Sequence, residues 1–139
     1  MIGSIDRAVT DLAQIQPLNN SDYAQCLEIF EANSDQRVGL LGWLEANVVA
    51  KMSQDANAIL SVGCGTGAFD ECILRYARAR MNQVTYLGIE PNEISAAEFS
   101  QTMGKQASHQ VDVSVLLQKF GEQVFENKFD LILFVHSIY

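Results

Sequence analysis

From residue 58 onward the chain contains four short apolar segments. They cover residues 58–62, 84–89, 111–117 and 129–135. Short apolar runs bounded by polar and turn-forming residues predict β-strands with buried faces. Apolar and polar residues alternate in the third segment, whereas the fourth is almost wholly apolar, as a central parallel strand is. We therefore expect a sheet built from these segments.

Apolar residues at helical spacing lie between these predicted strands. After the first strand, apolar residues at positions 69, 73, 76 and 77 predict a helix that runs to about residue 80. After the second strand, Asn92 is placed to cap a helix over residues 93–104, and Gly104 is placed to end it. Strands that alternate with helices predict an α/β protein with a doubly wound, mostly parallel sheet.

Two amphipathic helices are predicted ahead of the first strand. The first covers residues 21–33, with Ser21 and Asp22 as caps, and the second follows Asp35, its expected cap. We expect their apolar residues to pack in the core or to form a lid. These residues are Tyr23, Cys26, Leu27 and Phe30 in the first helix, and Val38, Leu41, Trp43, Leu44, Val48 and Val49 in the second.

Length, composition and charge narrow the class of protein. A chain of 139 residues that is 48% hydrophobic and 19% charged predicts a single globular domain. Its formal net charge of −8 repels a phosphate backbone, so we expect no nucleic-acid partner. The longest apolar run, residues 131–135, is too short to span a bilayer. We expect a soluble, cytoplasmic protein with no membrane partner.

Cysteine and histidine residues are few. Cys26, Cys64 and Cys72 contain no C-x-x-C pair, and the chain has only two histidines, so we expect neither a disulfide framework nor a metal site. Cys26 and Cys72 fit small apolar positions inside helices. Cys64 lies in a glycine-rich loop, where a reactive thiol is the less favoured alternative because no base is apparent beside it.

The segment "ILSVGCGTGAFD", residues 59–70, places glycines at 63, 65 and 67 directly after the first predicted strand. A glycine-rich turn between a parallel strand and a helix brings backbone N–H groups close to a ligand at the carboxyl edge of the sheet. Gly63, Gly65 and Ala68 fit the G-x-G-x-x-A dinucleotide pattern, and the Lys-Ser/Thr of a P-loop is missing. The loop alone leaves the ligand open.

Glu90 narrows this choice. It follows Gly67 by 23 positions and ends the second predicted strand. An acidic side chain at this place accepts hydrogen bonds from both hydroxyls of a ribose, which favours a nucleoside over an isolated phosphate. The alternative is a strand-end residue that caps the following helix.

Three segments, in order over residues 58–139, resemble the class I S-adenosylmethionine-dependent methyltransferases: "ILSVGCGTG", "YLGIEPNE" and "FDLILFVHSIY". The resemblance implies a Rossmann-like fold of seven strands, of which this chain supplies about four, with S-adenosyl-L-methionine as cofactor. It implies methyl transfer to an amine nitrogen or hydroxyl oxygen of a small molecule. Many members carry an acid where this chain has Ser61. This serine, the "EPN" after the second strand and the aromatic-rich end of the fourth strand make the chain look most similar to the histamine N-methyltransferase-like branch.

The same resemblance assigns roles to single residues. His136 would face the acceptor and orient or deprotonate it, because its unperturbed pKa lies near neutrality. The alternative for His136 is a strand-end histidine bonded to a backbone carbonyl. Tyr139 and Tyr23 are further candidates for substrate contact, although core packing is the favoured interpretation of Tyr23. The residues implied to bind the cofactor are Gly63, Gly65, Gly67, Glu90, Ser95 and Val135.

The predicted organisation is one domain over residues 1–139, with a helical lead-in or lid over 1–55 and a Rossmann-like core over 58–139. A sheet that stops after its fourth strand exposes an apolar edge. We therefore expect the cofactor-binding part of a longer protein, with a homodimer through that edge as an alternative. The competing functions are a non-catalytic nucleoside-cofactor-binding or assembly module and a nicotinamide-dependent dehydrogenase. The acidic charge and the missing Asn/Asp-Pro-Pro-aromatic motif favour a small-molecule acceptor over a nucleobase.

Overall fold

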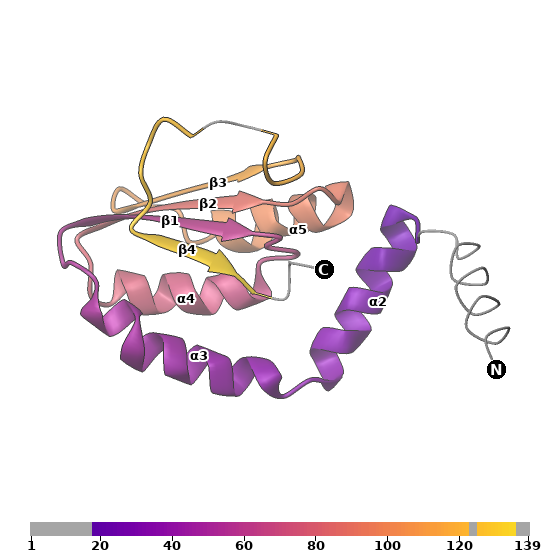
Figure 1. Cartoon of the computed structure of the whole chain (residues 1–139), viewed down its shortest axis with the longest axis horizontal. Helices are drawn as coiled ribbons and strands as arrows, with labels where there is room; N and C mark the ends of the chain where they lie inside the picture. The colour runs from indigo at the N-terminus through magenta and orange to yellow at the C-terminus, as the bar shows by residue number, and fades with distance from the viewer. Residues whose placement is uncertain (1–17, 123–124, 136–139) are drawn as a thin grey trace, which may run out of the picture.

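The computed structural model describes residues 18–122 and 125–135, and its centre is a parallel β-sheet (Figure 1). Within these ranges four strands form one sheet in the order β3–β2–β1–β4, and all neighbouring pairs are parallel. The predicted α/β fold is therefore confirmed, with strand ends shifted by one or two residues. The strands are β1 (Ala56–Val62), β2 (Gln83–Ile89), β3 (Val111–Leu116) and β4 (Leu131–Phe134).

The register aligns the carboxyl ends of the strands. Val62 of β1 lies opposite Ile89 of β2 and Phe134 of β4, and Ile89 lies opposite Leu116 of β3. The loops that leave the four strands therefore begin at one edge of the sheet, where ligands bind in open α/β sheets.

Two helices follow the first two strands, as predicted. They are α4 (Ala68–Arg78) and α5 (Glu93–Gly104). Asn92 is the N-cap of α5, and its side chain accepts the backbone N–H groups of Ile94 and Ser95 at 3.0 and 3.1 Å. Such a cap satisfies donors that have no partner inside the helix, so the helix begins where the capping residue sets it.

Two further helices precede the sheet, and their caps differ from the prediction. The helix α2 (Asn20–Asn33) is capped by Asn19, which accepts the Asp22 N–H at 2.9 Å, so Ser21 and Asp22 are not its caps. Asp35 is the N-cap residue of α3 (Gln36–Asn47), but its side chain makes no capping hydrogen bond. A short 3₁₀ turn, η1 (Val49–Lys51), leads from α3 toward β1.

The main core lies between one face of the sheet and the helices on that side, α3, α4 and α5. Tyr86 and Ile59 of the sheet, Ile73 of α4 and Phe99 of α5 are fully buried there. The opposite face of the sheet carries a smaller cluster of Leu60, Val62 and Ile89, against which Phe125 and Phe129 of the β3–β4 connection pack. One face thus supplies most of the apolar burial that stabilises the fold.

The helix α2 crosses the carboxyl edge of the sheet and does not lie on a face (Figure 1). None of its described side chains is buried, so the core packing favoured for Tyr23 is wrong. Cys26 lies inside this helix, as predicted, and is exposed. In α3, Leu44 is buried as predicted, whereas Trp43 is 57% exposed. No helix within the described ranges is long and apolar enough to cross a membrane.

Candidate functional site

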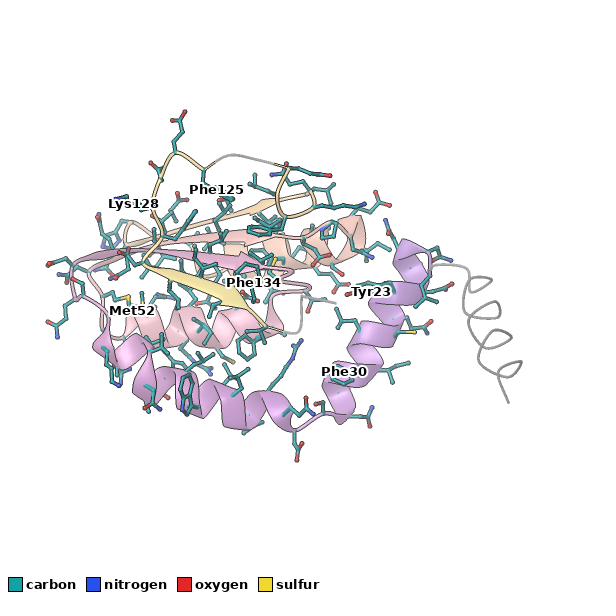
Figure 2. All side chains as sticks on the ribbon, viewed as in Figure 1. Tyr23, Phe30, Met52, Phe125, Lys128 and Phe134 are labelled. Atoms are coloured by element: carbon teal, nitrogen blue, oxygen red, sulfur yellow. The ribbon has the colours of Figure 1, made fainter. Side chains whose placement is uncertain are left out.

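A cavity of about 460 Å³ lies at the carboxyl edge of the sheet, between α2 and the glycine loop. Its volume is in the range of small-molecule sites. Five of the predicted site residues line it: Gly63, Gly65, Glu90, Val135 and Tyr23. Figure 2 shows Tyr23 and Phe30 on α2, the helix that borders this edge.

Two other predicted residues lie away from this cavity. Gly67 and Ser95 do not line it. Ser95 is fully buried, and its backbone N–H is taken by the Asn92 cap at the start of α5. Its hydroxyl is buried and has no hydrogen-bond partner among the described residues, and the predicted contact from Ser95 to a nucleoside stays a prediction. His136 and Tyr139 lie outside the described residues.

The glycine loop turns sharply because three of its residues have left-handed backbone angles. Gly63, Gly65 and Gly67 have φ values of 65°, 58° and 84°, which side chains rarely permit. The Gly63 N–H donates to the Ile89 carbonyl at 2.8 Å, which fixes the start of the loop to the end of β2. At Gly67 an added Cβ would meet core atoms, with Phe99 at 2.9 Å, whereas at Gly65 it would meet Leu27 at 3.4 Å. Gly67 is therefore a packing residue.

Glu90 is fixed in the cavity wall by two backbone donors. One carboxylate oxygen, Oε2, accepts the Gly65 N–H at 2.9 Å, and the other, Oε1, accepts the Asn92 N–H at 2.9 Å. The side chain is only 5% exposed. A carboxylate has about four acceptor sites, so two remain for a ligand's hydroxyl groups. The N-cap of α5 is Asn92. This excludes the alternative interpretation, in which Glu90 caps that helix.

Two cations that the sequence analysis did not single out also line the cavity. Arg37, in the first turn of α3, places its guanidinium 5.8 Å from the centre of the Phe69 ring. Lys119 comes from the connection between β3 and β4. Neither residue belongs to a motif, and both are distant in sequence from the glycine loop that lines the same cavity.

A buried polar pair lies under the loop. The Tyr86 hydroxyl donates to Asp70 Oδ1 at 2.8 Å. Asp70 lies in the first turn of α4 and is only 2% exposed. Burial raises the pKa of Asp70 to about 6, while the hydroxyls of Ser61 and Tyr86 and the charge of Arg37 oppose the rise. The charge of Arg37, a residue that lines the cavity, therefore acts on this buried acid.

Cys64 also lines the cavity. Burial, together with the nearby charges of Asp70 and Glu90, raises the pKa of its thiol far above the ordinary value. A nucleophilic cysteine needs a lowered pKa, so the geometry disfavours the reactive-thiol alternative. The described residues contain no group of three or more His, Cys, Asp or Glu side chains that could hold a metal ion.

Comparison with known proteins identifies the fold. The sheet and helices match solved structures of S-adenosylmethionine-dependent methyltransferases, the class that the motifs predicted. One is the plantazolicin methyltransferase BpumL, solved with a desmethylPZN analogue and SAH, at 15% identity and a TM-score of 0.54. Another is magnesium protoporphyrin IX methyltransferase (ChlM) from Synechocystis PCC 6803 with bound SAM, at 17% identity and a TM-score of 0.50.

The extent of these matches is partial. They cover 80% and 85% of this chain, but only 40% of BpumL and 49% of ChlM. The chain thus spans less than half the length of either enzyme. No protein-family model and no curated protein matches it. At this level of identity the comparison establishes the Rossmann-like methyltransferase fold.

Proposed function

We propose that the chain binds S-adenosyl-L-methionine in the cavity at the carboxyl edge and serves in methyl transfer to a small-molecule acceptor. The observation that carries the proposal is the carboxylate of Glu90, fixed in the cavity wall by the Gly65 and Asn92 N–H groups. A carboxylate held in this way needs no rearrangement to accept the two hydroxyls of a ribose. The cofactors named for ChlM and BpumL support the same ligand.

The remaining lining residues fit the other parts of that ligand. Gly63 and Gly65 let the backbone approach its methionine part, and Val135 forms a wall beside it. Arg37 is suited to the methionine carboxylate, because a guanidinium binds carboxylates with two parallel hydrogen bonds. The bound cofactor supplies a methyl group already activated on a sulfonium, so the protein chiefly aligns donor and acceptor.

The acceptor side of the proposal rests on neighbouring residues. Tyr23 lines the cavity from α2, which suits a lid over the site within the lead-in of residues 1–55. His136 directly follows Val135 in the sequence and is proposed to orient the acceptor, with Tyr139 as a further contact. An amine nitrogen or a hydroxyl oxygen is the proposed methyl-accepting atom.

Calorimetric titration with S-adenosylhomocysteine tests the proposal. We expect the native chain to bind it, and we expect Glu90→Gln to weaken binding about 10- to 100-fold, because hydrogen bonds to charged groups contribute about 1.5–3 kcal/mol. Glu93→Gln is the matched control, since Glu93 is exposed in the first turn of α5. Absence of binding, or equal affinity of the native and Glu90→Gln chains, contradicts the proposal. Binding of reduced nicotinamide dinucleotide instead supports a dehydrogenase.

A further inference from the structure

The ionisable residues around the cavity have an unusual balance. Among the described residues that line it, Arg37 and Lys119 are cationic and Glu90 is the single acid. The Glu90 carboxylate already accepts two backbone N–H groups. The whole chain carries a formal net charge of −8. The cations in the lining thus outnumber the acids, two to one, in a protein of net negative charge, and this favours an anionic group on a ligand.

Local contacts hold the backbone around Lys119 near the end of β4. The ring of the next residue, Phe120, meets the ring of Phe134 edge to face, with centroids 5.3 Å apart. The Lys119 N–H donates to the Glu122 carboxylate at 3.1 Å. Phe134 directly precedes Val135, which lines the cavity. Lys119 thus enters the site from the connection that follows β3, whereas Arg37 lies beside Phe69 at the start of α4.

The ammonium of Lys119 is available to a ligand. Within the described part of the chain no carboxylate forms an ion pair with it; the ion pair found there joins Arg80 and Glu45. Lys119 is exposed, and its flexible stem lets the charged group follow a bound molecule. The apolar side chains Tyr23, Leu27 and Phe30 of α2 also line the cavity.

We propose that the methyl acceptor is a small acid with an apolar body. Its carboxylate is bound by Lys119, its body packs against α2, and a separate amine nitrogen or hydroxyl oxygen of the same molecule accepts the methyl group. The inference rests on the proposed function, in which Arg37 is occupied by the carboxylate of the donor. The donor also brings a sulfonium and an ammonium into the site. A protonated amine would add a further positive charge there, whereas the carboxylate of an acid offsets one of the positive charges already present.

An NMR titration of the full chain with three matched probes tests the inference. The probes are phenylacetate, phenylacetamide and 2-phenylethylamine, which share an apolar ring and differ in charge. We follow the backbone amides of the cavity with and without saturating S-adenosylhomocysteine. We expect phenylacetate to bind at least tenfold more tightly than 2-phenylethylamine. Equal or tighter binding of the amine, or no shift of the cavity amides with any probe, overturns the inference.

Variants of Lys119 test whether this residue causes the preference for phenylacetate over 2-phenylethylamine. We expect Lys119→Gln to weaken phenylacetate binding about tenfold and Lys119→Glu to reverse the preference in favour of the amine. Lys105→Glu is the matched control, because Lys105 is an exposed lysine at the end of α5. An unchanged affinity for phenylacetate in Lys119→Gln counts against the assignment.

The two proposals fail separately. If S-adenosylhomocysteine does not bind but the acid preference persists without it, the proposed function fails and the anion site stands. If S-adenosylhomocysteine binds and the acid is not preferred, only the acceptor class is wrong.

Discussion

The two sides of the glycine loop, residues 63–67, differ in what they contact. Beneath the loop, a Cβ on Gly67 would lie 2.9 Å from Phe99, and a Cβ on Gly88 of β2 would lie 2.7 Å from Cys64 Sγ. Above it, a Cβ on Gly65 would meet Leu27 at an ordinary 3.4 Å across the cavity. The evenly spaced glycines of this loop therefore meet two different surroundings, close packing below and a cavity above.

Substitutions on the two sides of the loop should therefore have different effects, one on stability and the other on binding. Substitutions beneath the loop are expected to change the free energy of unfolding, because interiors are packed too densely to absorb an extra methyl group. Substitutions above it are expected to change ligand affinity, because the atoms there face a cavity. The following predictions test that separation, from the largest expected effect to the smallest.

Gly88→Ala should give the largest loss of stability. Its Cβ would lie 2.7 Å from Cys64 Sγ and 2.9 Å from Phe99 Cζ, so the side chains beneath the loop must shift. Overpacking of this kind costs roughly 1–3 kcal/mol, measurable by urea unfolding. Gly39→Ala in α3 is the matched control, because nothing lies within 4 Å of its Cβ. The control should gain about 0.5–1 kcal/mol. Equal stabilities of the two variants would contradict this account.

The buried acid beneath the loop should make stability depend on pH. The pKa of Asp70 is raised from 3.8 to about 6 in the folded protein, so the folded state binds this proton more tightly than the unfolded state. Its contribution to stability is therefore fully present below about pH 4 and is lost as the pH rises through 6. From pH 7 to pH 4.5 the wild type should gain roughly 2 kcal/mol relative to Asp70→Asn.

Unfolding curves of both chains across this pH range provide the measurement. Asp112→Asn is a suitable control, since Asp112 is exposed on β3. Its unfolding free energy should follow that of the wild type across the range. If Asp70→Asn also follows the wild type, the buried carboxyl does not have the assigned effect.

Arg37→Gln should affect binding above the loop and leave the fold intact. We expect the affinity for S-adenosylhomocysteine to fall about tenfold, because the ligand's carboxylate loses a charged partner worth about 1.5 kcal/mol. The affinity for 5′-methylthioadenosine, which lacks the amino-acid part, should stay within about twofold. Arg80→Gln, which removes a surface ion pair with Glu45, should change neither. An equal loss of affinity for both ligands would show that Arg37 does not bind the carboxylate of S-adenosylhomocysteine.

The fold was predictable because its signals are local. Apolar runs set β1 to β4, and the Asn92 cap and Gly104 set the bounds of α5. The helix α2 was placed correctly in sequence, but its Tyr23 lines the cavity and does not pack in the core as favoured. Its apolar stripe is the same whether it faces a core or a ligand cavity, so periodicity cannot distinguish the two.

The site was predictable where topology alone decides position. Gly63, Glu90 and Val135 follow three parallel strands, and the ends of such strands meet at one edge. Arg37 and Lys119 were missed because each reaches the cavity through tertiary packing, one beside Phe69 and the other through its neighbour Phe120. No spacing rule connects these positions. The branch of the family and the edge-to-edge dimer stay predictions.

The exposed position of α2 has a consequence for hydrogen exchange. The helix is bonded to α5 by the Asn92 Nδ2–H, which donates to the Asn20 carbonyl at 2.9 Å, and none of its described side chains is buried. Local opening of such a helix costs little free energy, so its amides should exchange early. A ligand in the cavity would supply the missing apolar surface. At 100 times Kd, linkage adds about 2.7 kcal/mol, enough to slow exchange roughly 100-fold if opening expels the ligand.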